Sequence, residues 1–153
     1  MLITHPEQAQ RTIVVAGVDT HKDTHHVAVL DLAGRPLAIE QFPASPPGYR
    51  QLLAFVAAHG VIDKIGVELT GSYGAGLTRH LTAAGVTVME VNTTDKATRA
   101  RRGKDDAIDA VAAAQKTLSG MASATPKDTT GATEAIRLLT AVRDLAVKQR
   151  TQA

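Results

Sequence analysis

Apolar and polar positions fall into blocks along the chain, and each block predicts one element. Residues 12–18 (TIVVAGV) form an apolar, β-branched run, and residues 26–32 form a second run of strand length. Residues 37–42 alternate apolar and polar side chains, as an edge strand does, and the turn sequence AGRP at 33–36 precedes them. These blocks predict a three-stranded antiparallel meander.

Helix and strand patterns alternate after the meander. Apolar residues at helical spacing predict a helix at 48–59, and the short run KIGVEL at 64–69 predicts a strand. A second helix at 74–84 and a strand at 86–91 follow. Because this succession favours parallel strands joined by right-handed crossovers, the sequence predicts an α/β domain with a mixed sheet.

The pattern also divides the chain into regions. Residues 1–11 are polar and predict a flexible N-terminus, residues 12–120 form the domain with an alanine-rich helix at 105–118, and residues 121–131 read as a linker. A last helix occupies 132–153, with apolar residues at every third position. It is interpreted as the start of a coiled coil that would continue in a longer protein and favours a homodimer.

Composition narrows the class of protein. Apolar residues make up 44% of the chain and aromatic residues 3%, so the core must be aliphatic. Without cysteine there is neither a disulfide framework nor a thiolate metal site. The sequence shows no signal peptide and no run of the roughly 18 apolar residues that a membrane span needs, which predicts a cytoplasmic protein without a membrane partner.

Four carboxylates occupy positions where ligands bind in such folds. Asp19 ends the first apolar run and Glu68 ends the fourth, and ligands bind outside the carboxyl ends of strands in open α/β sheets. Asp106 and Asp109 are three apart, so they share one face of the alanine-rich helix. If the first and fourth strands are neighbours, all four carboxylates can converge.

Converging carboxylates repel one another unless a cation lies among them. Oxygen ligands favour Mg²⁺ or Mn²⁺, and two such ions serve phosphodiester chemistry. The net charge is only +2, but the segment KATRARRGK at 96–104 holds five basic residues and no acid, which suits a nucleic-acid backbone. The residues expected to contact nucleic acid are Thr70, Ser72, Tyr73, Lys96, Arg99, Arg101, Arg102 and Lys104.

Simpler interpretations compete for several of these residues. The aspartates could be ordinary strand-end or helix-start acids, and for Asp105 the helix start is the preferred interpretation. His21, His25 and His26 suggest a metal site, but strand alternation points His25 and His26 to opposite faces, which argues against one. Tyr73 could stack on a base or pack against the domain.

Three segments together resemble the DEDD-type insertion-sequence transposases, which are recombinases guided by a bridge RNA. They are GVDTHKDTHHVAV from Gly17, VELTGSYG from Val67 and RRGKDDAIDAVAAA from Arg101, and the resemblance covers about residues 13–118. It implies a RuvC-like domain with an RNase H-type fold, acting on DNA with a guide RNA in a bacterial cytoplasm.

Carried over by residue, the resemblance makes Asp19, Glu68, Asp106 and Asp109 the catalytic metal ligands for Mg²⁺ or Mn²⁺. Asp105 stands where the family has serine or threonine, so Asp105 competes with Asp106 for the third position, and register with Asp109 favours Asp106. The resemblance also implies a second domain whose serine attacks DNA. We expect that domain to lie beyond this sequence, so that the chain alone should not complete recombination.

Three other functions remain open at this point. A RuvC-like Holliday-junction nuclease would share the fold and need no second domain. An actin-like ATPase or sugar kinase also begins with a strand, a loop and a strand carrying an aspartate, although this chain lacks a glycine-rich adenosine loop. A non-catalytic nucleic-acid-binding module would show no metal dependence.

Overall fold

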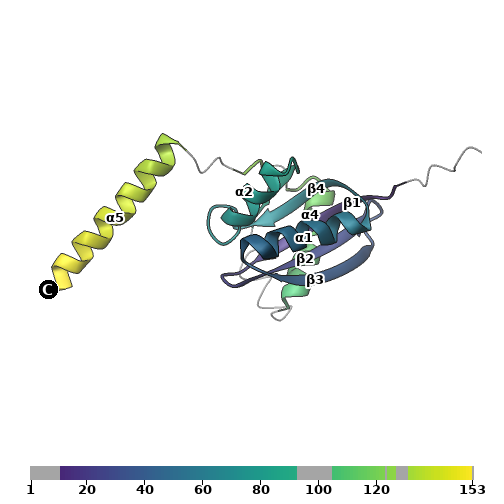
Figure 1. Cartoon of the computed structure of the whole chain (residues 1–153), viewed down its shortest axis with the longest axis horizontal. Coiled ribbons are helices and arrows are strands. Elements are labelled where there is room, and N and C mark those ends of the chain that lie inside the picture. The colour runs from purple at the N-terminus through teal and green to yellow at the C-terminus, as the bar shows by residue number, and fades with distance from the viewer. Residues whose placement is uncertain (1–10, 93–104, 123, 127–130, 153) are drawn as a thin grey trace, which may run out of the picture.

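The computed structural model describes residues 11–92, 105–122, 124–126 and 131–152. Five strands form one mixed sheet in the order β3-β2-β1-β4-β5 (Figure 1), which confirms the predicted fold class. The strands are β1 (Ile13–Thr20), β2 (Thr24–Asp31), β3 (Pro36–Pro43), β4 (Val61–Glu68) and β5 (Val88–Val91). The helices are α1 (Pro46–His59), α2 (Ala75–Ala83), α4 (Asp106–Leu118) and α5 (Ala132–Gln152).

The first three strands form the predicted antiparallel meander. β1 pairs with β2 in a register that sets Asp19 opposite His26, and β2 pairs in turn with β3. β1 extends to Thr20, two residues beyond the predicted end, because its last residues still pair with the first residues of β2. The meander therefore carries Asp19 inside a paired strand rather than in a loop.

β1 is also the strand at which the pairing changes from antiparallel to parallel. It pairs with β4 in parallel, with Val18 opposite Val67, and β4 pairs in parallel with β5. The first and fourth strands are therefore neighbours, as the convergence of carboxylates required. Asp19 follows Val18 and Glu68 follows Val67, so the two acidic residues lie side by side at the C-terminal ends of these two strands.

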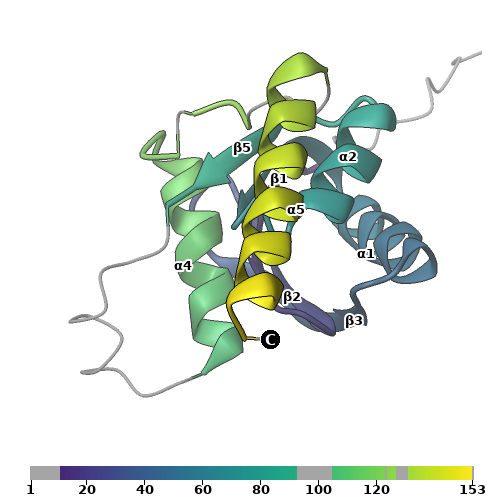
Figure 2. The same cartoon turned by 90° about the vertical axis from the view of Figure 1, so that its left-hand side faces the viewer.

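Helices cover both faces of the sheet: α1 and α2 lie on one face and α4 lies on the other (Figure 2). Side chains alternate along β1 accordingly. Its residues Val14, Ala16 and Val18 join a core with leucines and valines of α1 and α2. On the other face, Ala28 and Leu30 of β2 pack with Ala110 and Ala114 of α4.

The α4 side of the sheet is packed unusually closely because small residues meet there. A Cβ at Gly17 of β1 would overlap the backbone nitrogen of Ala114. Ala113 and Ala114 are fully buried against the sheet. Glycine and alanine therefore let the backbone of α4 lie directly on β1, and this contact fixes the start of α4 relative to Asp19.

α1 begins at Pro46, two residues before the predicted start at residue 48. Ser45 is the N-cap, and its hydroxyl accepts a hydrogen bond from the backbone N–H of Gly48 at 3.4 Å. Proline at the first helical position gives up no intrahelical hydrogen bond, because that N–H has no partner in a helix. The two prolines thus start the helix rather than precede it.

The described residues after α4 divide into two parts. Ala122 is buried, and the backbone N–H of Glu90 in β5 donates to the Ala124 carbonyl at 2.7 Å, so this part of the expected linker lies on the sheet edge. α5 exposes its apolar side chains, including Ile136 (64%) and Leu139 (69%). Among helices in the described part of the chain, none has the length and apolar character to cross a membrane.

Candidate metal centre

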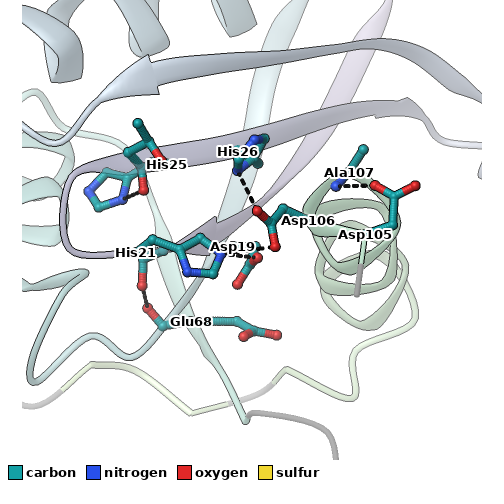
Figure 3. Close-up of polar contacts among 10 residues, drawn as sticks. Asp19, His21, His25, His26, Glu68, Asp105, Asp106 and Ala107 are labelled. Carbon is teal, nitrogen blue, oxygen red and sulfur yellow. Dashed lines mark hydrogen bonds and ion pairs between the residues drawn. The ribbon is translucent and has the colours of Figure 1, made fainter. Parts of the chain in front are cut away.

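Two buried carboxylates end neighbouring strands. Asp19 in β1 is 2% exposed, and Glu68, the last residue of β4, is 3% exposed. The hydroxyl of Thr20 donates a hydrogen bond to the Glu68 carbonyl at 2.9 Å, which ties the two strand ends together. The strand pairing and this hydrogen bond therefore hold both acidic residues next to each other at the C-terminal ends of β1 and β4 (Figure 3).

The first turn of α4 brings two more carboxylates to these strand ends. One oxygen each from Asp19, Asp106 and Asp109 lie within 4.8 Å of one another. Asp105 instead caps the helix: its exposed side chain accepts a hydrogen bond from the Ala107 N–H at 3.0 Å (Figure 3). The structure thus gathers three of the four predicted carboxylates, places Glu68 on the adjacent strand end, and gives Asp105 the helix-start role.

Burial and neighbouring charge both act on Asp19. Burial raises the pKa of the Asp19 carboxyl, because it disfavours the charged form. A contact with His21 lowers that pKa, whereas Asp109 and Asp106 raise it. The net effect is a raised pKa, with burial as its largest cause and the two aspartates of α4 as smaller ones.

Two histidines contact the same carboxylates, which the sequence did not predict. His21 Nε2 lies 2.8 Å from Asp19 Oδ2 and 3.3 Å from Asp106 Oδ1. His26 Nδ1 lies 3.9 Å from Asp106 Oδ2 (Figure 3). His25 points to the other face, as alternation predicted, and stacks on Tyr49 with ring centroids 5.7 Å apart. His25 therefore contacts a side chain of α1 and lies on the face of the sheet away from the acidic residues.

The loop after Glu68 turns tightly beside the site. Leu69 has a φ of 50°, unusual for a residue other than glycine. Its carbonyl accepts hydrogen bonds from the N–H groups of Ser72 and Gly74, both at 2.9 Å. Thr70 is buried, whereas Ser72 and Tyr73 are exposed. Of the three loop residues expected to contact nucleic acid, two therefore present accessible side chains.

The other residues expected to contact nucleic acid lie outside the described part of the chain. They are Lys96, Arg99, Arg101, Arg102 and Lys104. The described neighbours of that segment are Asn92, directly after β5, and Asp105, directly before α4. Lys116 of α4 donates a hydrogen bond to the Asn92 carbonyl at 3.0 Å. Both flanking residues are thus placed by the fold, Asn92 by this bond and Asp105 by its cap on α4.

The donor set at Asp19, Asp106 and Asp109 fits a hard divalent cation. All three offer carboxylate oxygens, which Mg²⁺ and Mn²⁺ prefer as ligands. A cation among them would offset the repulsion between carboxylates that contributes to the raised pKa of Asp19. The partial exposure of Asp106 and Asp109 gives such an ion a path to solvent.

Comparisons with known proteins show the family and the fold of the chain. A family model described as a transposase, of the DEDD and IS110 type, matches residues 16–153. The RuvC protein of T. thermophilus, solved in complex with a Holliday junction substrate, matches with a TM-score of 0.50 and 18% identity, over 75% of this chain and 99% of that chain. This likeness confirms the expected RuvC-like, RNase H-type fold.

A second solved structure is more distant. The Thermoplasma acidophilum Pelota protein matches with a TM-score of 0.35 and 11% identity, over 71% of this chain and 38% of that one. No curated protein matches the chain in sequence.

Proposed function

Because the chain belongs to the DEDD transposase family of the IS110 type, we propose that its domain carries the metal-dependent site of that transposase and acts on DNA phosphodiester bonds. The observation that carries this proposal is the meeting of Asp19 from β1 with Asp106 and Asp109 from α4, with oxygens within 4.8 Å. An acidic residue buried on a central strand needs a compensating partner, and a divalent cation is one.

Each residue has a distinct part in the proposed site. Asp19, Asp106 and Asp109 would hold Mg²⁺ or Mn²⁺, and Glu68 is the fourth carboxylate, held beside Asp19 by the strand pairing. A bound ion of this kind supplies positive charge to a phosphodiester and activates an oxygen nucleophile. Asp105 keeps the first turn of α4 in place through its cap, which orients Asp106.

We further infer that the substrate is DNA and that a bridge-type RNA guides it, as the family resemblance implies. The exposed Ser72 and Tyr73 beside Glu68 support a nucleic-acid surface, because an exposed aromatic ring can stack on an unpaired base. Recombination would also need the serine-bearing domain of the family. The exposed apolar residues of α5 support a dimer, and the bacterial cytoplasm is the expected compartment.

Calorimetric titration with Mn²⁺ and Mg²⁺ tests the site. Asp106→Asn should weaken binding by more than about 100-fold, since losing even an outer partner of a metal ligand costs about 10–100-fold. Asp105→Asn is the matched control: it changes the neighbouring acid, and asparagine still serves as an N-cap. The assignment is wrong if both variants bind as the wild type does, or if both lose binding equally.

A junction nuclease is a second candidate, favoured by the fold likeness to RuvC. Incubation of this chain with a four-way DNA junction and Mn²⁺ discriminates between the two. Cleavage that disappears in Asp106→Asn would favour the nuclease. Metal binding without junction cleavage would favour the transposase domain.

A further inference from the structure

A second group of possible ligands lies beside the carboxylates and differs from them in chemistry. It consists of His21, His26 and Asp106, each offering one ligand atom within 4.8 Å of the others. We propose that these three side chains form a separate cation site that takes Zn²⁺ or a similar transition-metal ion. The site shares Asp106 with the proposed function, but its ion and two of its three ligands are different.

The spacing of the ligand atoms is close to what such an ion needs. Tetrahedral Zn²⁺ binds nitrogen and oxygen at about 2.0–2.1 Å, so two of its ligand atoms lie about 3.4 Å apart. His21 Nε2 is already 3.3 Å from Asp106 Oδ1. His26 Nδ1, at 3.9 Å from Asp106 Oδ2, would have to move by about 0.5 Å, which a side-chain rotation supplies.

The fold explains why these two histidines, rather than His25 and His26, form the pair. His26 pairs with Asp19 across the β1–β2 ladder and points to the face that α4 covers. His21 follows β1 directly, in the short connection to β2, and its ring meets that of His26 edge-on with centroids 6.1 Å apart. Asp106 then enters between them from the first turn of α4 (Figure 3).

The surroundings of the histidines suit a ligand. His26 Nδ1 is buried, and among the described residues no hydrogen-bond partner reaches it. The side chains of His21 and Asp106 are 37% and 33% exposed, which leaves room for an ion to enter and for water to complete its coordination. A buried ring nitrogen that makes no hydrogen bond is costly unless something binds it, and a metal ion would do so.

The two groups should prefer different ions. Imidazole nitrogen suits Zn²⁺, Co²⁺, Ni²⁺ and Cu²⁺, whereas carboxylates alone suit Mg²⁺ and Mn²⁺. The carboxylate of Asp106 presents Oδ1 to His21 and Oδ2 to His26. Binding of Zn²⁺ would also draw His21 away from Asp19, with which it is now in contact at 2.8 Å. Zn²⁺ should therefore compete with Mg²⁺ or Mn²⁺ for Asp106.

Titration of the untagged chain with Zn²⁺ tests this site, with visible spectra of bound Co²⁺ as a direct view of the ligands. Separate His21→Asn and His26→Asn variants should each weaken Zn²⁺ binding by more than about tenfold and alter the Co²⁺ spectrum. His59→Asn, at the end of α1, is the histidine control and should change neither. Circular dichroism establishes that each variant is folded.

Asp109→Asn separates this proposal from the previous one, because Asp109 belongs to the carboxylate group alone. It should weaken Mn²⁺ binding and leave Zn²⁺ binding in place, whereas His26→Asn should do the reverse. Zn²⁺ affinity and Co²⁺ spectra unchanged in both histidine variants would overturn the histidine site. Mn²⁺ affinity unchanged in Asp109→Asn would instead count against the carboxylate site and leave the Zn²⁺ result intact.

Discussion

Asp19 and Asp31 are both buried aspartates of the hairpin formed by β1 and β2, and they differ in their partners and in the direction in which their pKa is shifted. Asp31 ends β2, and its carboxylate accepts hydrogen bonds from the N–H groups of Ala33 and Arg35 at 2.9 and 3.0 Å and from Arg35 Nε at 2.8 Å. These bonds, chiefly that from the Arg35 backbone, lower the pKa of Asp31. Burial raises the pKa of Asp19, and two further carboxylates lie against it.

The contrast separates an acid that neighbouring N–H groups and an arginine satisfy from one that lies among other carboxylates. The partners of Asp31 come from the turn between β2 and β3 that follows it, so the charge is satisfied as soon as that turn forms. Asp19 meets its neighbours only when α4, far along the chain, packs on β1, and two of those neighbours carry the same charge. A buried acid whose own fold leaves it among like charges is a candidate for ligand binding.

The largest expected effect comes from replacing a glycine near Asp19, and a glycine near Asp31 provides the control. In Gly17→Ala the new methyl group would overlap α4, so the free energy of unfolding should fall by about 1–3 kcal/mol or more. The displaced helix should also abolish Mn²⁺ binding. Thermal unfolding and Mn²⁺ calorimetry on the refolded variant measure both effects.

Gly34→Ala is the control for that change, in the turn that satisfies Asp31. Gly34 has a φ of 82°, so alanine should cost about 1–2 kcal/mol through backbone strain. Its methyl group would make only an ordinary contact with Leu118, at 3.6 Å. Mn²⁺ binding should survive. Equal Mn²⁺ affinity in both variants would show that the α4 contact does not build the site.

A smaller effect should distinguish the two aspartates directly. Without metal, Asp19→Asn should raise the free energy of unfolding by about 0.5–2 kcal/mol, as removal of a strained functional group commonly does, and should lose Mn²⁺ binding. Asp31→Asn should lower thermal stability, because it loses the ion pair with Arg35, and should bind Mn²⁺ normally. Unfolding of both variants in chelator and in Mn²⁺ checks this; the comparison fails if Asp19→Asn is destabilised in chelator.

The parts of the site that depend on regular structure could be predicted from the sequence. Apolar runs placed Asp19 and Glu68 at the ends of the first and fourth strands, and the structure supplies the condition that the sequence left open, because β1 and β4 are neighbours. Helical spacing put Asp106 and Asp109 on one face. These are consequences of period and topology, which a sequence expresses directly.

The parts that depend on irregular backbone were missed. The position of His21 is set by the short connection between β1 and β2, and its contact with Asp106 joins residues far apart in the chain. Leu69 takes a positive φ that nothing in its residue type indicates. The helix start at Pro46 did have a signal, Ser45 followed by two prolines, and it was placed too late.

The smallest expected effect is the pH dependence of stability, where the two aspartates should differ in sign. The folded pKa of Asp31 lies below its ordinary value of 3.8, so its stabilising contribution is present above that value and is lost as the pH falls through the folded pKa. The folded pKa of Asp19 lies above 3.8, so its protonated form favours folding below that value, and this contribution is lost as the pH rises through the folded pKa.

Thermal unfolding in chelator at a series of pH values from about 7 to below the ordinary aspartate pKa of about 4 tests this. The stability advantage of the wild type over Asp31→Asn should shrink on acidification. The advantage of Asp19→Asn over the wild type should shrink over the same range, because protonation removes the charge that the substitution removes. Parallel curves for wild type and Asp19→Asn would mean that folding leaves the pKa of Asp19 unchanged, and the case for a cation beside it would lose its electrostatic basis.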